Sequence, residues 1–247
     1  MKTALVLSAG GMFGAYQAGA WSVLADRLQP DLIVGASIGA INGWAIAGGC
    51  SPADLIERWL TLDCAQTYRL RFPRAIHGGI LDCRPLKAMI EEMYHRFRPR
   101  IDYATVITEL RHLQPTIVPG DRVTAETLKA TTAIFGIFEQ VRIDNKIYTD
   151  GGTLGAVPLW AAAELGATRI VAVDAFVSQP SFIPKLFVRT VRALSRHLPA
   201  KPENIEVIRI APPACLGSGR DMLLWSRDRA EQWIERGRRD ALAAYVT

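Results

Sequence analysis

A serine flanked by two glycines forms the most informative segment of the chain. The stretch Val-Gly-Ala-Ser-Ile-Gly-Ala places Ser37 in a G-x-S-x-G pattern between an apolar segment, residues 31–34, and a segment of helical composition, residues 38–47. A tight turn from strand to helix exposes its central serine, and Gly35 and Gly39 let the two backbones approach without Cβ clashes. The pattern favours a nucleophile. The alternative is a glycine-rich packing turn with a capping serine.

A second glycine-rich turn, Ser-Ala-Gly-Gly-Met-Phe-Gly, follows the apolar residues 3–7. Such a loop exposes backbone N–H groups that can bind an oxyanion or a phosphate. A dinucleotide site would need a glycine where Ala9 stands and an acid after the second strand, whereas Asp31 precedes that strand. The four cysteines are scattered without a C-x-x-C pair. We therefore expect an oxyanion site, no cofactor and no metal ion.

A serine hydroxyl becomes a good nucleophile only when a neighbouring base accepts its proton. Asp150 is the better candidate, because it ends an apolar strand and precedes two glycines; a turn-forming aspartate is the alternative. A triad could be assembled from Ser37, Asp174 and His197. However, the common α/β-hydrolase elbow follows several strands, whereas only about 30 residues precede this one. The histidines lie among basic or mixed residues, as on solvated segments: His77, His95, His112 and His197.

Short apolar segments alternate with segments of helical periodicity along the chain. We predict strands at residues 3–7, 31–34, 141–143, 146–149, 169–173 and 207–210, and helices at about 13–28, 38–47, 53–60, 85–97 and 221–245. Asp144 and Asn145 indicate a hairpin turn. The alternation predicts an α/β fold around a mainly parallel central sheet. The length is that of one domain, residues 1–247, with enough chain to bury a full core.

The formal net charge of +5 is concentrated in two blocks, residues 64–100 and 181–202, each of which carries +5. The balance of apolar and charged residues excludes a disordered tail, a collagen-like fibre and a disulfide-stapled mini-protein. No apolar run reaches the roughly 20 residues of a membrane span, so we expect a cytoplasmic protein. The mixed arginine and aromatic stretches accompany no recognised nucleic-acid-binding module, so we expect no nucleic acid partner.

The second basic block contains no acid and predicts a helix over residues 184–198. Lys185, Arg189, Arg192 and Arg196 recur at helical spacing, away from an apolar face that includes Leu194. A basic amphipathic helix indicates peripheral contact with an anionic membrane. The alternative is a solvated face over an ordinary packed helix.

Taken in this order, the segments resemble the patatin-like phospholipase family, which combines a glycine-rich oxyanion loop, a G-x-S-x-G elbow and a later D-G-G or D-G-A. Residues 129–138 are similar to the block that precedes the family's catalytic aspartate. The resemblance implies a three-layer α/β/α fold and hydrolysis of glycerolipid acyl esters through an acyl-enzyme, without histidine or metal. It assigns Ser37 as nucleophile, Asp150 as base, Gly10, Gly11 and Met12 as oxyanion donors, and Gly35 and Gly39 to the elbow.

The chain departs from the family pattern at three positions. Phe13 stands where the family usually has Arg or Lys, Phe135 where it usually has Pro, and Thr153 where it often has Asn. Backbone donors do not depend on side-chain identity, so an oxyanion hole can persist. The two phenylalanines motivate one alternative, a catalytically weak lipid-binding regulator; a non-lipid carboxylesterase or an acyltransferase with the same dyad is another. We expect residues of about 64–115 to form a lid or acyl-chain entrance.

Overall fold

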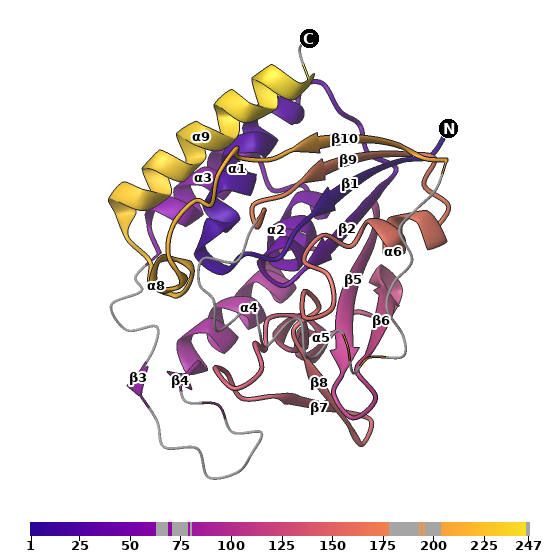
Figure 1. The fold of residues 1–247 in the computed structure, drawn as a ribbon, viewed down its shortest axis with the longest axis vertical. Coiled ribbons are helices and arrows are strands. Elements are labelled where there is room, and N and C mark those ends of the chain that lie inside the picture. Colours follow the sequence, from indigo (N-terminus) through magenta and orange to yellow (C-terminus); the bar gives the residue numbers. More distant parts are fainter. Residues whose placement is uncertain are drawn as a thin grey trace.

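The computed structural model describes residues 1–62, 69–70, 79, 81–177, 193, 195 and 204–245. An eight-stranded sheet in the order β10-β9-β1-β2-β5-β8-β7, with β6 also paired to β5, forms its centre (Figure 1). The strands of this sheet are β1 (Thr3–Leu7), β2 (Leu32–Ala36), β5 (Asp102–Glu109), β6 (Gln114–Pro119), β7 (Val141–Ile143), β8 (Lys146–Thr149), β9 (Arg169–Val173) and β10 (Glu206–Ile210). A separate pair contains β3 (Arg69–Leu70) and β4 (Leu81–Asp82).

The described helices lie between these strands and after the last of them. They are α1 (Gly14–Leu24), α2 (Ile38–Ala47), α3 (Pro52–Leu60), α4 (Arg84–Arg96), α5 (Ala125–Thr131), α6 (Leu159–Glu164), α8 (Gly219–Leu223) and α9 (Arg227–Tyr245). Two short 3-10 helices are η1 (Gly11–Phe13) and η3 (Gly120–Arg122). Ser51 caps α3 by accepting a hydrogen bond from the Asp54 N–H, with Pro52 in the first turn.

The sheet is parallel from β10 to β5 and antiparallel where β5 meets β6 and β8 and where β8 meets β7. Every residue of β1 and β2 is buried, as expected for parallel strands covered on both faces. The prediction of a mainly parallel sheet is therefore confirmed.

Helices cover both faces of the sheet. Because successive side chains point to opposite faces, Leu5 and Leu7 pack with α1 and α2, whereas Ala4 and Val6 join a second cluster that includes Ala161 of α6. The three-layer α/β/α arrangement is thereby confirmed, with the larger core on the side of α1, α2 and α9.

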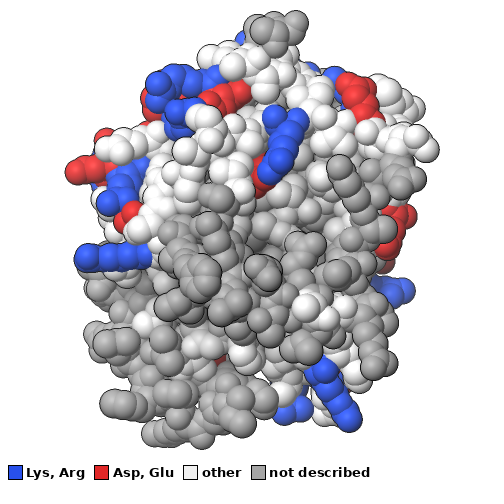
Figure 2. All heavy atoms as spheres, viewed as in Figure 1, with Lys and Arg blue, Asp and Glu red and all other residues white. Residues whose placement is uncertain are grey.

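The single C-terminal helix predicted for about 221–245 is wrong, because two helices occupy this region. Ser218 and Asp221 form a capping box that begins α8, and Leu224 adopts an extended conformation before α9 begins. On α9, acidic and basic side chains lie close together (Figure 2), and Arg227–Glu231 and Arg236–Asp240 pair at i,i+4 spacing.

The strand β5 was not predicted, although it lies in the middle of the sheet. It occupies Asp102–Glu109, within the stretch 64–115 that was expected to form a lid or acyl-chain entrance. A lid or entrance formed by the other residues of this stretch stays a prediction. The predicted basic helix at 184–198 lies outside the described residues, apart from residues 193 and 195. Within the described ranges, no helix is both long and apolar enough to cross a membrane.

Candidate active site

The strand β5 sets the relative positions of Ser37 and Asp150. In the parallel pair Ala36 lies opposite Val106, so the next residue, Ser37, comes level with Ile107. In the antiparallel pair Thr149 lies opposite Thr108, so the residue after it, Asp150, also comes level with Ile107. The two registers therefore bring the serine and the aspartate to the same level on either side of one strand.

The turn that carries Ser37 is tightly constrained. Ser37 has φ 54° and ψ −127°, a strained conformation for a residue with a side chain. A Cβ on Gly35 would lie 2.4 Å from the carbonyl oxygen of Gly39, and a Cβ on Gly39 would lie 2.4 Å from that of Leu7. Both glycines are therefore needed for the close approach of β2, α2 and the end of β1.

Asp150 is a buried carboxylate whose two oxygen atoms differ in their hydrogen bonding. Its Oδ1 accepts a hydrogen bond of 2.6 Å from the Gly152 N–H, whereas Oδ2 is buried with no hydrogen-bond partner in the described part of the chain. Burial raises the pKa of Asp150 to about 6, and the nearby Ser37 side chain and the Gly152 amide lower it by less. A buried acceptor next to a serine is the arrangement that a general base requires.

The loop between β1 and α1 lies between the elbow and the aspartate. A Cβ on Gly14 would lie 2.7 Å from Cγ1 of Ile38, and a Cβ on Gly152 would lie 2.5 Å from Cβ of Ala9. Within the described ranges, the amides of residues 10–12 donate no hydrogen bond to the protein. These N–H groups are therefore available for a negatively charged oxygen, as in an oxyanion hole.

A buried chain of hydrogen bonds supports this loop from behind. Gln17 Nε2 donates to the carbonyl oxygen of Ser8 at 2.7 Å, and Asn42 Nδ2 donates to Gln17 Oε1 at 2.9 Å. Trp59 Nε1 in turn donates to Asn42 Oδ1 at 3.2 Å. Sequence reasoning missed these residues; the available signal was a polar side chain inside each of two otherwise apolar helices, α1 and α2.

Thr131, at the end of α5, joins the nucleophile turn to the aspartate turn. Its Oγ1 accepts a hydrogen bond of 3.0 Å from the Ser37 N–H and donates one of 2.6 Å to the carbonyl oxygen of Val106. Its own carbonyl oxygen accepts from the Gly151 N–H. Thr131 lies in the 129–138 block that the family resemblance singled out, without a role assigned to it.

We expect Thr131→Val to lower the free energy of unfolding by about 1 to 3 kcal/mol, because it leaves the buried Ser37 N–H without an acceptor. Urea unfolding at neutral pH measures this loss. The matched control is Thr132→Val, since among the described residues the Thr132 hydroxyl bonds only to carbonyls within α5. An equal loss in both variants would contradict the bridging role.

The alternative triad of Ser37, Asp174 and His197 stays a prediction, because His197 lies outside the described residues. Asp174 is buried and pairs with Arg209, and its Oδ1 accepts from the Phe176 N–H. His95 pairs with Glu91 and His112 with Glu109, whereas His77 and His197 lie outside the described residues. No group of three or more His, Cys, Asp or Glu side chains within the described ranges could hold a metal ion.

Phe13 points away from the loop that it follows. Its side chain is fully buried and meets Trp233 of α9 edge to face, with ring centroids 5.1 Å apart. Phe135 is half-buried in the turn after α5. The large side chain at position 13 thus belongs to the core between α1 and α9.

Comparison with known proteins identifies related sequences and folds. The family model described as Patatin-like phospholipase matches residues 5–163. No curated protein sequence matches the chain. Among solved structures, VipD from Legionella pneumophila superposes with a TM-score of 0.57 at 11% identity, covering 98% of this chain and 66% of that one. The type III effector protein ExoU gives a TM-score of 0.47 at 13% identity, covering 98% and 52%. The likeness to VipD shows a shared fold, and the chain spans about two thirds and about half of the lengths of these two proteins.

Proposed function

The chain belongs to the patatin-like phospholipase family, and on that premise we propose that it is a serine hydrolase that cleaves acyl esters of lipids through a Ser37–Asp150 dyad. One observation carries the proposal: the buried carboxylate of Asp150 interacts with the side chain of Ser37, which lies on a strained turn, and Asp150 Oδ2 accepts no hydrogen bond from any other described residue. Unsatisfied buried acceptors are rare in folded proteins, and they concentrate where chemistry requires them.

In the first half of the proposed reaction, Asp150 accepts the Ser37 proton while Oγ attacks the ester carbonyl carbon. The negative charge that develops on the carbonyl oxygen is bound by the amides of residues 10–12. The alcohol then leaves with the proton from Asp150. In the second half, Asp150 takes a proton from water, hydroxide attacks the acyl-enzyme, and Ser37 regains its proton as the free acid is released.

The pKa of Asp150 gives a prediction for the pH dependence. A base must be deprotonated, so kcat/KM on a soluble ester should fall about tenfold per pH unit below pH 6, the region of the raised pKa. An ordinary aspartate would hold its activity down to about pH 4. A plateau that extends to pH 4 would therefore argue against Asp150 as the base.

A fluorophosphonate probe tests the proposed function directly, because it labels only an activated serine. We expect covalent labelling of the wild-type protein and none of Ser37→Ala. Ser51→Ala is a suitable control, since Ser51 is an exposed helix cap remote in sequence from the elbow and should leave the labelling intact. Failure of the wild type to label, with the protein folded, would refute the enzyme proposal.

The remaining alternatives differ in their substrate. A lipase should prefer phospholipid vesicles over short soluble esters, a carboxylesterase the reverse, and an acyltransferase should need an alcohol acceptor. The burial of Phe13 against Trp233 favours catalysis over a purely regulatory role, because the side chain does not occupy the loop that would hold the oxyanion. Contact with an anionic membrane and a cytoplasmic location stay predictions of the sequence.

A further inference from the structure

A cavity of about 320 Å³ lies between α2, α3 and α4. Ile38, the residue after the nucleophile, and Met12 of the oxyanion loop line it. The cavity therefore adjoins both the nucleophile turn and the loop that would hold an ester carbonyl. Its volume is at the lower end of the range typical of ligand pockets.

The described residues that line this cavity offer a ligand almost no free polar group. Ile41, Leu55 and Met89 are among its apolar side chains. The polar atoms of Asn42 are already used, because Nδ2 donates to Gly14 O and Gln17 Oε1 and Oδ1 accepts from Trp59 Nε1. The chemistry of the walls therefore suits a hydrocarbon chain, whose burial gains about 0.8 kcal/mol per CH₂.

The charged side chains that line the cavity, Arg58 and Glu92, form an ion pair of 3.4 Å. Arg58 also donates to Met93 Sδ and lies 5.4 Å from the Phe97 ring centroid. Phe97 follows the last residue of α4 and lies against Gly48, which follows the last residue of α2. Because α2 begins at the nucleophile, the ion pair lies toward the end of the cavity remote from Ser37.

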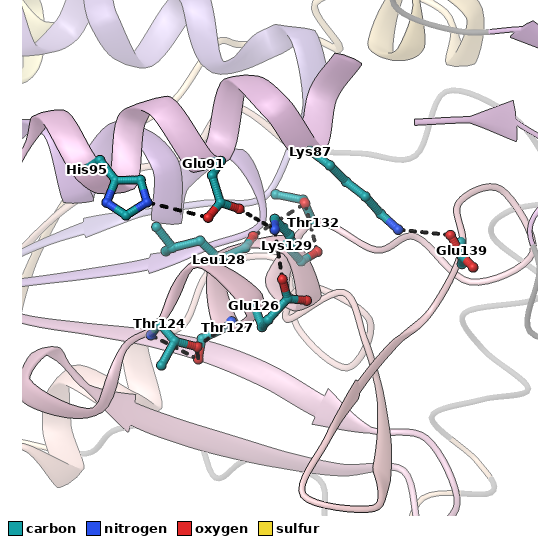
Figure 3. A network of polar contacts seen from close by, with 10 residues as sticks. All are labelled: Lys87, Glu91, His95, Thr124, Glu126, Thr127, Leu128, Lys129, Thr132 and Glu139. Carbon is teal, nitrogen blue, oxygen red and sulfur yellow. Dashed lines mark hydrogen bonds and ion pairs between the residues drawn. The ribbon is translucent and has the colours of Figure 1, made fainter. Parts of the chain in front are cut away.

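The α4 wall is held from behind by a second set of ion pairs (Figure 3). Lys129 of α5 pairs with Glu91 and Glu126, and Lys87 pairs with Glu139. The Lys129–Glu91 pair joins α4 to the helix that carries Thr131, and the Lys87–Glu139 pair joins α4 to the segment after that helix. One wall of the cavity is therefore attached to the helix that positions Ser37.

On the premise that this cavity takes the acyl chain of the substrate, we propose that the Arg58–Glu92 pair limits the length of that chain. The identity of the chain as an acyl group rests on the proposed function; the binding of a hydrocarbon does not. A chain that reached the pair would have to separate two charges or strip them of water, which offsets the gain from further methylene groups.

The test is the binding of saturated fatty acids of increasing length to the Ser37→Ala protein by titration calorimetry, below their micelle concentrations. Affinity should rise about fourfold per CH₂, the equivalent of about 0.8 kcal/mol, and then level off. Adding Arg58→Met should move the levelling point to longer acids, since Glu92 is exposed and keeps its pair with Arg96. Arg227→Met, which removes an exposed pair on α9, is the matched control and should leave the levelling point unchanged.

A second variant covers the case in which Arg58→Met fails to fold. Met89→Trp fills part of the cavity with a larger side chain and should move the levelling point to shorter acids. Affinity that does not depend on chain length, or a levelling point that neither variant moves, would overturn the proposal. If binding behaves as expected while the wild type hydrolyses no ester and takes no probe, the cavity assignment stands and the proposed function fails.

Discussion

Replacing Asp150 with asparagine is expected to lower kcat by about 10²- to 10⁴-fold and to make the folded protein more stable at neutral pH. Asparagine keeps the oxygen that accepts from the Gly152 N–H but cannot take a proton from Ser37. The rise in the pKa of Asp150 from 3.8 to about 6 corresponds to a free energy of about 3 kcal/mol. The folded state is less stable by this amount when the carboxylate is charged.

The sign of the stability effect depends on pH. A carboxyl group with a raised pKa contributes stability that is fully present below about pH 4 and is lost as the pH rises through about 6. The stability gain of Asp150→Asn, up to about 3 kcal/mol, should therefore appear at pH 8 and vanish near pH 4. Urea unfolding of both proteins at the two pH values measures it.

The two readouts of this variant separate catalysis from structure. A variant that loses activity because it is misfolded would be less stable at both pH values. Retained activity, or an equal stability change at both pH values, would show that the pKa of Asp150 and its role have been assigned wrongly. Activity lost together with stability gained is the signature of a charged group kept in the interior for function.

Replacing Gly11 with alanine should lower kcat by about 10²- to 10³-fold, the typical cost of one lost oxyanion donor. Gly11 has φ +56°, and an added Cβ would lie 2.3 Å from the carbonyl oxygen of Met222 in α8. Either α8 or the loop must move, and the amides of residues 10–12 move with the loop. Single-turnover kinetics on a soluble ester measures the loss in the acylation step.

The matched control for this variant is Gly166→Ala. Gly166 has φ +84°, so alanine there carries a similar backbone strain, but no heavy atom lies within 4 Å of the added Cβ. Gly166→Ala should lose about 1 to 2 kcal/mol of stability. Gly11→Ala should lose more, because its Cβ also meets the Met222 carbonyl oxygen, and only Gly11→Ala should lose activity. Similar activity in the two would show that the position of this loop does not control the reaction.

The parts of the site that could be predicted from sequence are those with local requirements. A strained turn needs glycines at defined offsets from Ser37, and a fully buried strand such as β1 must be apolar throughout. Gln17 and Thr131 could not be assigned in this way, because their roles depend on which carbonyl or amide the fold brings next to them. The strand β5 could not be assigned either, although it is rich in β-branched residues, because Thr105 and Thr108 interrupt the apolar run that marks a buried strand.

The position of β5 between the two reactive residues also ties activity to the order of folding. Almost half of the chain separates Ser37 from Asp150, so their contact has a high sequence separation and a high cost in chain entropy. During synthesis the elbow emerges first and has no base. Under the proposed mechanism its hydroxyl stays inert until β8 pairs with β5. A nascent or partly unfolded chain would thus hydrolyse no ester, because hydrolysis begins only when the sheet is complete.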